Sequence, residues 1–131
     1  MHPIFSDQFY HDGRGPELQK VHYEFDGRTI AAADYYLADK PYTKDNLKHI
    51  RFVMPQVFMF TPEEVESYVP MFNPWNGENR FALVNFGKSS WLKSFNPFHL
   101  DKCSHFRCMF YDEFLDIICE EIQIGLGGYS A

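Results

Sequence analysis

The alternation of apolar and polar side chains predicts a chain built mainly of β-strands. In the stretch KVHYEF, Val21, Tyr23 and Phe25 fall on one face of an extended strand, and polar residues fall on the other. Asp26-Gly27 follows as a turn signal, and a second, largely apolar run covers residues 28–38. The pattern predicts a β-hairpin whose Val21, Tyr23 and Phe25 face the core.

Three later segments continue this pattern. The run IRFVMPQVFMF is apolar and β-branched, and Pro55 in its middle lacks a backbone donor, which predicts an edge strand or a bulge. The run FALVNF predicts a short strand. The run HFRCMFY alternates, with Phe106, Cys108 and Phe110 on one face and His105 on the other.

One segment carries the signals of a helix start. Thr61 can act as N-cap, Pro62 fits the first helical position, and two glutamates follow near the positive end of the helix dipole. We therefore predict a short helix at residues 61–69. Residues 113–124 fit two structures: the spacing of their apolar side chains suits a helix, whereas their isoleucine content and their position directly after a strand favour a strand.

These elements predict an α+β fold in a single domain. A chain of 131 residues is long enough for one core and short for two. We expect a mainly antiparallel, twisted sheet of about five or six strands built from hairpins, with one short helix and with a C-terminal helix as the alternative to the last strand. Residues 1–19 are expected to form an irregular lead-in, and residues 125–131 a mobile tail.

Composition narrows the compartment and the kind of partner. Aromatic residues make up 18% of the chain, so we expect a core built largely from rings. Lys and Arg number 12 against 18 Asp and Glu, and the net charge of -6 argues against binding to nucleic acid or to an anionic membrane surface. No signal sequence or membrane-spanning apolar run is visible, and 3 cysteines is an odd count that fits reduced thiols. We therefore expect a cytoplasmic protein, and its charge is compatible with a basic protein partner.

The run HLDKCSHFRC contains ligand types that zinc accepts, namely His99, Cys103, His105 and Cys108. Structural zinc sites usually combine two short pairs from separate segments, whereas all four residues here lie in one run. On a strand, Cys108 also points away from His105. We therefore expect no metal and no other cofactor, and we predict that Cys108 packs in the core.

Two catalytic patterns are incomplete. Gly87-Lys88-Ser89 matches the end of a phosphate-binding loop, but residue 82, where the first glycine belongs, is alanine. Cys103 could act as a nucleophile with a neighbouring histidine as base and Asp101 as acid, yet no local motif favours this arrangement. The sequence leaves enzymatic activity uncertain and favours a non-enzymatic role.

Two tryptophans and a group of acids predict a binding surface. Trp75 and Trp91 each lie near an Asn-Pro turn with phenylalanine neighbours, and exposed rings of this kind mark binding sites. Asp112, Asp116 and Glu120 share one face of an extended strand and form an acidic stripe suited to a basic partner. We interpret the chain as a protein-binding module, such as an inhibitor, an immunity-type protein or an adaptor.

The alternative function belongs to a different class. A curved sheet can enclose an aromatic pocket for small-ligand binding or catalysis, with His22, Tyr23, Tyr35 or His105 pointing inward. A deep cavity with convergent polar groups would favour this pocket. A flat patch of rings bordered by acids would favour docking.

Overall fold

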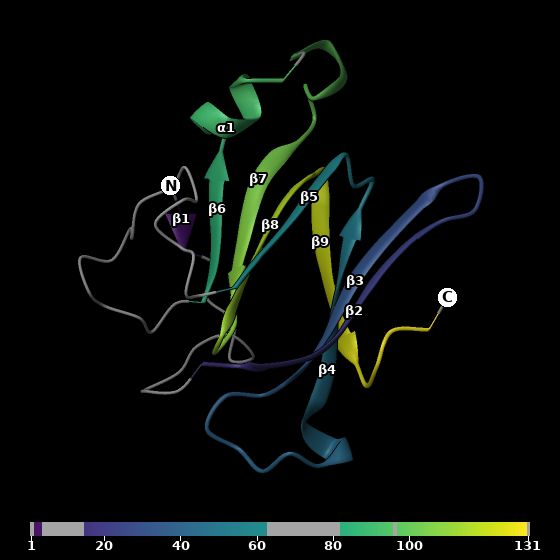
Figure 1. Cartoon of the computed structure of the whole chain (residues 1–131), viewed down its shortest axis with the longest axis vertical. Coiled ribbons are helices and arrows are strands. Elements are labelled where there is room, and N and C mark those ends of the chain that lie inside the picture. Colours follow the sequence, from purple (N-terminus) through teal and green to yellow (C-terminus); the bar gives the residue numbers. More distant parts are fainter. Residues whose placement is uncertain (1, 4–14, 63–81, 96, 131) are drawn as a thin grey trace.

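The computed structural model describes residues 2–3, 15–62, 82–95 and 97–130, which form two antiparallel sheets packed face to face (Figure 1). One sheet has five strands in the order β1-β6-β7-β8-β5, and the other has four in the order β2-β3-β4-β9. The strands are β1 (His2–Pro3), β2 (Glu17–Phe25), β3 (Thr29–Tyr36), β4 (Leu47–Val53), β5 (Val57–Pro62), β6 (Leu83–Gly87), β7 (Ser104–Met109), β8 (Glu113–Cys119) and β9 (Glu121–Leu126). The helical elements are α1 (Ser90–Lys93) and the 3-10 turns η1 (Lys44–Asn46) and η3 (Pro97–His99).

The predicted α+β class and the single antiparallel domain are confirmed, with the strands divided between two sheets. The prediction of a helix at residues 61–69 is wrong for its first two residues, because Thr61 and Pro62 are the last two residues of β5. They pair with Phe114 and Glu113 of β8, so cross-strand pairing overrides the local capping signals. The other residues of that prediction lie outside the described part of the chain.

The β2–β3 hairpin has the predicted turn and the predicted face. Val21 lies opposite Ala33 and Tyr23 opposite Ala31, and Val21 packs against the core. However, the exposed fraction is 54% for Tyr23 and 77% for Phe25, so the expectation that both lie in the core is wrong. The hairpin tip extends past the five-stranded sheet, as Figure 1 shows, and no described strand of that sheet covers Phe25.

A two-stranded ribbon bends from one sheet into the other. One strand of the ribbon runs from β4 into β5, and the other runs from β8 into β9. Because β4 pairs with β9 and β5 pairs with β8, both strands pass from one sheet to the other at the same point along the ribbon. The bend comprises residues 54–56 opposite Glu120, with Met54 at φ +52°. The backbone N–H of Gln56 donates to Ile118 (2.8 Å) and that of Glu120 to Val53 (2.9 Å), which keeps the ribbon paired through the bend. The run that was predicted to be an edge strand or to carry a bulge at Pro55 is instead divided by this bend into β4 and β5, of which β5 is an edge strand. Residues 113–124 belong to two strands, β8 and β9, and not to a helix.

The core lies between the inner faces of the two sheets. Cys108 packs there beside Phe106 and Phe110, as predicted. The buried members of this cluster are Ala31, Ala33, Tyr35, Ile50, Phe52, Ala82, Leu83, Phe106, Cys108, Phe110, Leu115, Ile117 and Cys119. A smaller cluster of Leu92, Leu100, Cys103 and Ile118 joins α1 to the outer face of the five-stranded sheet.

Strand pairing extends into both segments that the sequence analysis treated as irregular. Residues 17–19 of the expected lead-in belong to β2, and residues 125–126 of the expected tail belong to β9. Beyond β9, the backbone N–H of Gly127 donates to Leu47 (2.9 Å) and that of Tyr129 donates to the Asp34 carboxylate (2.8 Å). Among the described residues, no helix is long and apolar enough to cross a membrane.

Candidate functional site

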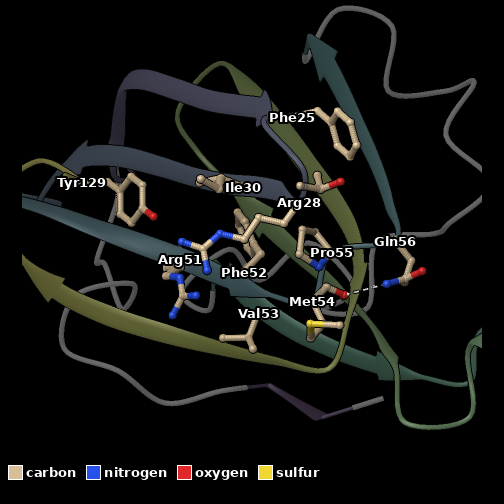
Figure 2. A pocket seen from close by; sticks show the side chains of 11 residues that line it. Phe25, Arg28, Ile30, Arg51, Phe52, Val53, Met54, Pro55, Gln56 and Tyr129 are labelled. Atoms are coloured by element: carbon tan, nitrogen blue, oxygen red, sulfur yellow. Dashed lines mark hydrogen bonds between the residues drawn. The ribbon is translucent and has the colours of Figure 1, made fainter. Parts of the chain in front are cut away.

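A pocket of about 310 Å³ lies beside the bend at residues 54–56, which we call the corner pocket. The hairpin turn between β2 and β3, the ends of β3 and β4, and the C-terminal Tyr129 surround it (Figure 2). Its lining residues are Phe25, Arg28, Thr29, Ile30, Arg51, Phe52, Val53, Met54, Pro55, Gln56 and Tyr129. The pocket therefore exists only because the ribbon bend and the hairpin tip meet at one end of the four-stranded sheet.

Two arginines supply the charge of the corner pocket. Figure 2 shows the guanidinium groups of Arg28 and Arg51 in its middle, and none of the described residues that line it is acidic. Arg51 donates to the amide oxygen of Gln123 at 3.1 Å, a neutral acceptor, and the Arg28 guanidinium makes no ion pair with the described residues. Two cations in one pocket repel each other, and a bound anion would remove that repulsion.

The walls of the corner pocket are apolar and partly open to solvent. Phe25 is 77% exposed and Met54 is 55% exposed, while Phe52 reaches the pocket from the core. Arginine forms bidentate hydrogen bonds with carboxylates and phosphates, and exposed rings bind flat apolar groups. This arrangement suits a ligand that combines an anionic group with a ring or an aliphatic part.

A polar cluster on the outer face of the four-stranded sheet holds Tyr129 in place. Asp34 accepts the backbone N–H of Tyr129 at 2.8 Å and a hydrogen bond from His22 Nε2 at 2.9 Å. His49 Nδ1 donates to the carbonyl oxygen of Gly127 at 3.0 Å. The Tyr129 ring meets both imidazoles edge-on, with centroids 5.5 Å from His22 and 5.7 Å from His49. The segment after β9 thus forms one wall of the corner pocket.

Small residues let this segment lie close to the sheet. A Cβ atom added at Gly128 would lie 3.1 Å from Asp34 Oδ2, and one at Gly125 would lie 2.6 Å from His49 Cε1. Ala32, on the outer face between β2 and β4, is fully buried. The chain therefore covers this part of the outer face, and larger side chains at these positions would displace the segment.

A second polar cluster is buried on the outer face of the five-stranded sheet. The Ser89 hydroxyl lies 2.8 Å from His105 Nδ1, and His105 Nε2 lies 2.8 Å from Asp116 Oδ1. Arg107 donates to the same carboxylate from Nε at 3.0 Å and from Nη2 at 3.3 Å. The side chains of His105 and Asp116 are both fully buried. A continuous hydrogen-bonded chain therefore runs from half-buried Ser89 to a buried ion pair.

Aromatic rings enclose this chain. The His105 imidazole lies 4.8 Å from the Trp91 ring and 4.9 Å from the Phe86 ring, measured between centroids. The Arg107 guanidinium lies 5.1 Å from the centroid of Phe114. These rings exclude water from the ion pair, which strengthens the electrostatic interactions inside it.

The docking residues predicted from the sequence do not form one surface in the described structure. Asp116 is fully buried in the ion pair with Arg107, so it cannot belong to an exposed acidic stripe, whereas Asp112 and Glu120 are exposed beyond the two ends of β8. Trp91 is half-buried against His105, and Trp75 lies outside the described residues. The alternation of side chains along a strand placed Asp116 on an outward face of β8, but it could not show that aromatic rings cover this face.

The four residues of the predicted aromatic pocket lie in different places. His22 bonds to Asp34 on the outer face of its sheet, and Tyr23 contacts Phe58 near the edge of the inner face, with centroids 5.0 Å apart. Tyr35 is in the core, where burial is the main cause that raises the pKa of its hydroxyl. His105 lies on the other sheet. They do not converge on one cavity.

The sequence analysis missed the residues that the structure does bring together. Arg28, Arg51 and Tyr129 come from three segments, and no short motif links them. Asp34 carried a usable signal, because an acid within the run TIAAADYY is unusual unless it is paired. Ser89 was considered only as part of a phosphate loop.

The cysteines are packing residues with suppressed acidity. Cys103, Cys108 and Cys119 are all free and buried. Burial is the largest cause that raises the pKa of each thiol, to about 12 for Cys119 and well above its usual value for Cys108. In the described part of the chain, no three His, Cys, Asp or Glu side chains are grouped to hold a metal ion.

Comparison of the chain with protein-family models, with curated proteins and with solved structures finds no match. The function must therefore be inferred from the geometry of these two sites.

Proposed function

We propose that this protein is a binding domain that receives an anionic ligand group between Arg28 and Arg51 in the corner pocket. The observation that carries the proposal is the presence of two guanidinium groups, with no carboxylate among the described lining residues, in a pocket of a chain whose net charge is -6. Arg28 is exposed and Arg51 is half-buried, so both guanidinium groups can reach an anionic group of a ligand in the pocket. This is a form of the ligand-binding function that the sequence offered as its alternative.

The dimensions of the corner pocket limit the ligand. Its volume of about 310 Å³ is at the lower end of the usual range for small-molecule sites, which is about 300 to 1,000 Å³. A single ring with one carboxylate or phosphate group fits this space. Phe25 and Tyr129 would contact the ring, and the two arginines would bind the anionic group.

The protein-docking function has less support from the described residues. It depended on a continuous acidic stripe and on exposed tryptophans, whereas Asp116 is buried and Trp91 packs against His105. A protein partner would enter the present proposal through an acidic side chain inserted in the corner pocket, and not through a basic surface. Three free, buried thiols suit the reducing cytoplasm in which we place the protein.

The test uses phenyl phosphate, an aromatic anion, and benzyl alcohol, an uncharged ring compound of similar size. Binding of each compound to the full chain is measured by competition with the fluorescent probe anilinonaphthalene sulfonate. We expect phenyl phosphate to bind more tightly than benzyl alcohol. Arg28→Gln and Arg51→Gln should each weaken phenyl phosphate binding about tenfold or more, because a hydrogen bond to a charged group contributes ~1.5–3 kcal/mol.

The matched control is Lys40→Gln, which removes one positive charge from an exposed position that does not line the pocket. Its affinity for phenyl phosphate should stay within about twofold of the wild-type value, because solvent and salt screen distant charges. Equal binding of phenyl phosphate to the wild type and to the Arg28→Gln, Arg51→Gln double variant would show that the proposal is wrong. Equal competition by benzyl alcohol would also contradict it.

A further inference from the structure

We propose that Ser89 is a nucleophilic hydroxyl, activated by His105, that can accept an acyl group from an activated ester. This activity is separate from the corner pocket, because Ser89 and His105 lie on the other sheet. The inference rests on the chain of half-buried Ser89 and fully buried His105 and Asp116, in which a hydroxyl, an imidazole and a carboxylate are joined by two hydrogen bonds of 2.8 Å each.

The hydrogen bonds define the direction of proton transfer. The Asp116 carboxylate can only accept, so His105 Nε2 carries the proton that it donates. His105 Nδ1 is then an acceptor, and the Ser89 hydroxyl donates to it. The lone pairs of Ser89 Oγ remain available, and one of them accepts the backbone N–H of Leu92 at 3.2 Å. A base in contact with the hydroxyl and a carboxylate that orients the base are the requirements for an activated serine.

Arg107 sets the strength of this activation. Its two hydrogen bonds hold the Asp116 carboxylate in place, which orients the His105 ring. The guanidinium shares Oδ1 of Asp116 with His105 Nε2, so this carboxylate is not reserved for the imidazole. We therefore expect slow reaction with activated esters.

The position of Ser89 allows access from one side. It follows Gly87, whose φ is +62°, at the turn between β6 and α1, and it is half-buried while its neighbour Ser90 is exposed. Trp91 contacts both His105 and Phe95, with ring centroids 4.8 Å and 5.8 Å apart. These rings provide apolar surface near the hydroxyl, which favours esters with an aromatic or short aliphatic acyl group.

The reaction balances with water as the second substrate. Ser89 Oγ attacks the carbonyl carbon, and its proton moves to His105 Nδ1. The bond from the carbonyl carbon to the leaving oxygen breaks, and the alcohol leaves with the proton from His105. Water then attacks the acyl-serine, again losing a proton to His105, and the carboxylic acid and the free hydroxyl of Ser89 are formed.

The experiment measures covalent labelling of the full chain with a fluorophosphonate, which forms a bond from serine oxygen to phosphorus and releases fluoride. Peptide mapping by mass spectrometry compares the labelling rates of Ser89 and Ser90. We expect Ser89 to react about a hundredfold or more faster than Ser90, because a positioned base contributes about 10²- to 10⁴-fold. The preference should disappear in urea, where both serines lack a base.

Three variants complete the test. Ser89→Ala should abolish fast labelling, Ser90→Ala should leave it unchanged, and His105→Gln should slow it to the rate of Ser90. If His105→Gln does not fold, the comparison of the two serines in the native wild type still decides the result. Equal labelling of Ser89 and Ser90 in the native chain, or fast labelling that persists in folded His105→Gln, would overturn the proposal.

Discussion

Replacing Asp116 by alanine should destabilise the fold by ~3–5 kcal/mol, the usual cost of removing one partner of a buried ion pair. The carboxylate accepts one hydrogen bond from His105 and two from Arg107, and its side chain is fully buried. Its removal leaves an imidazole N–H without an acceptor and a guanidinium that is only 5% exposed without a counter-charge. Domains of this size are usually stable by about 5–15 kcal/mol, so this single change would remove a large part of the total.

A double-mutant cycle with Arg107→Met separates the ion pair from the other contacts of Asp116. In the Arg107→Met background Asp116→Ala leaves no buried guanidinium without a counter-charge, and it should then cost only ~1–3 kcal/mol, the cost of the unpaired imidazole N–H. The coupling between the two residues should therefore be ~2 kcal/mol. Urea unfolding of each variant, followed by far-ultraviolet circular dichroism, gives the four free energies of unfolding.

Asp112→Ala and Glu120→Ala are the matched controls, because both carboxylates are exposed beyond the ends of the same strand. Each should change the free energy of unfolding by less than ~0.5 kcal/mol. A cost below ~1 kcal/mol for Asp116→Ala, or additive effects of the Asp116 and Arg107 changes, would refute the reasoning from burial.

Two further outcomes can be measured by the same unfolding assay. Phe52→Ala should lower the free energy of unfolding by ~3–5 kcal/mol, as large deletions in a core do. Phe25→Ala should lower it by less than ~1 kcal/mol, because Phe25 is 77% exposed. Similar costs for the two variants would contradict the observed hairpin geometry. Burial raises the pKa of the Cys119 thiol from about 9 in the unfolded chain to about 12 in the folded chain, so the unfolded thiol loses its proton first. The contribution of this thiol to the free energy of unfolding is therefore present in full below pH 9 and falls as the pH rises toward about 12. This three-unit difference corresponds to ~4 kcal/mol, so Cys119→Ala should flatten the alkaline loss of stability, and an unchanged slope would disprove the assignment.

The sequence by itself determined those features that depend on neighbouring residues. The alternation in KVHYEF and the Asp26-Gly27 turn gave the β2–β3 hairpin and its inward face, and Pro55 marked the bend in the ribbon. The same periodicity placed Cys108 in the core. These features follow from backbone geometry, in which side chains alternate along a strand and proline lacks a donor.

Only the tertiary structure decided how deeply each face is covered and which distant residues meet. Phe25 lies on the inward face but beyond the reach of the other sheet, and Asp116 lies on an outward face that aromatic rings cover. Ser89 and His105 are 16 positions apart, and His105 and Asp116 are 11 apart, so no local spacing joins them. Periodicity fixes the side of a strand on which a residue points, but burial, pairing and charge neutralisation depend on segments that the fold alone brings into contact.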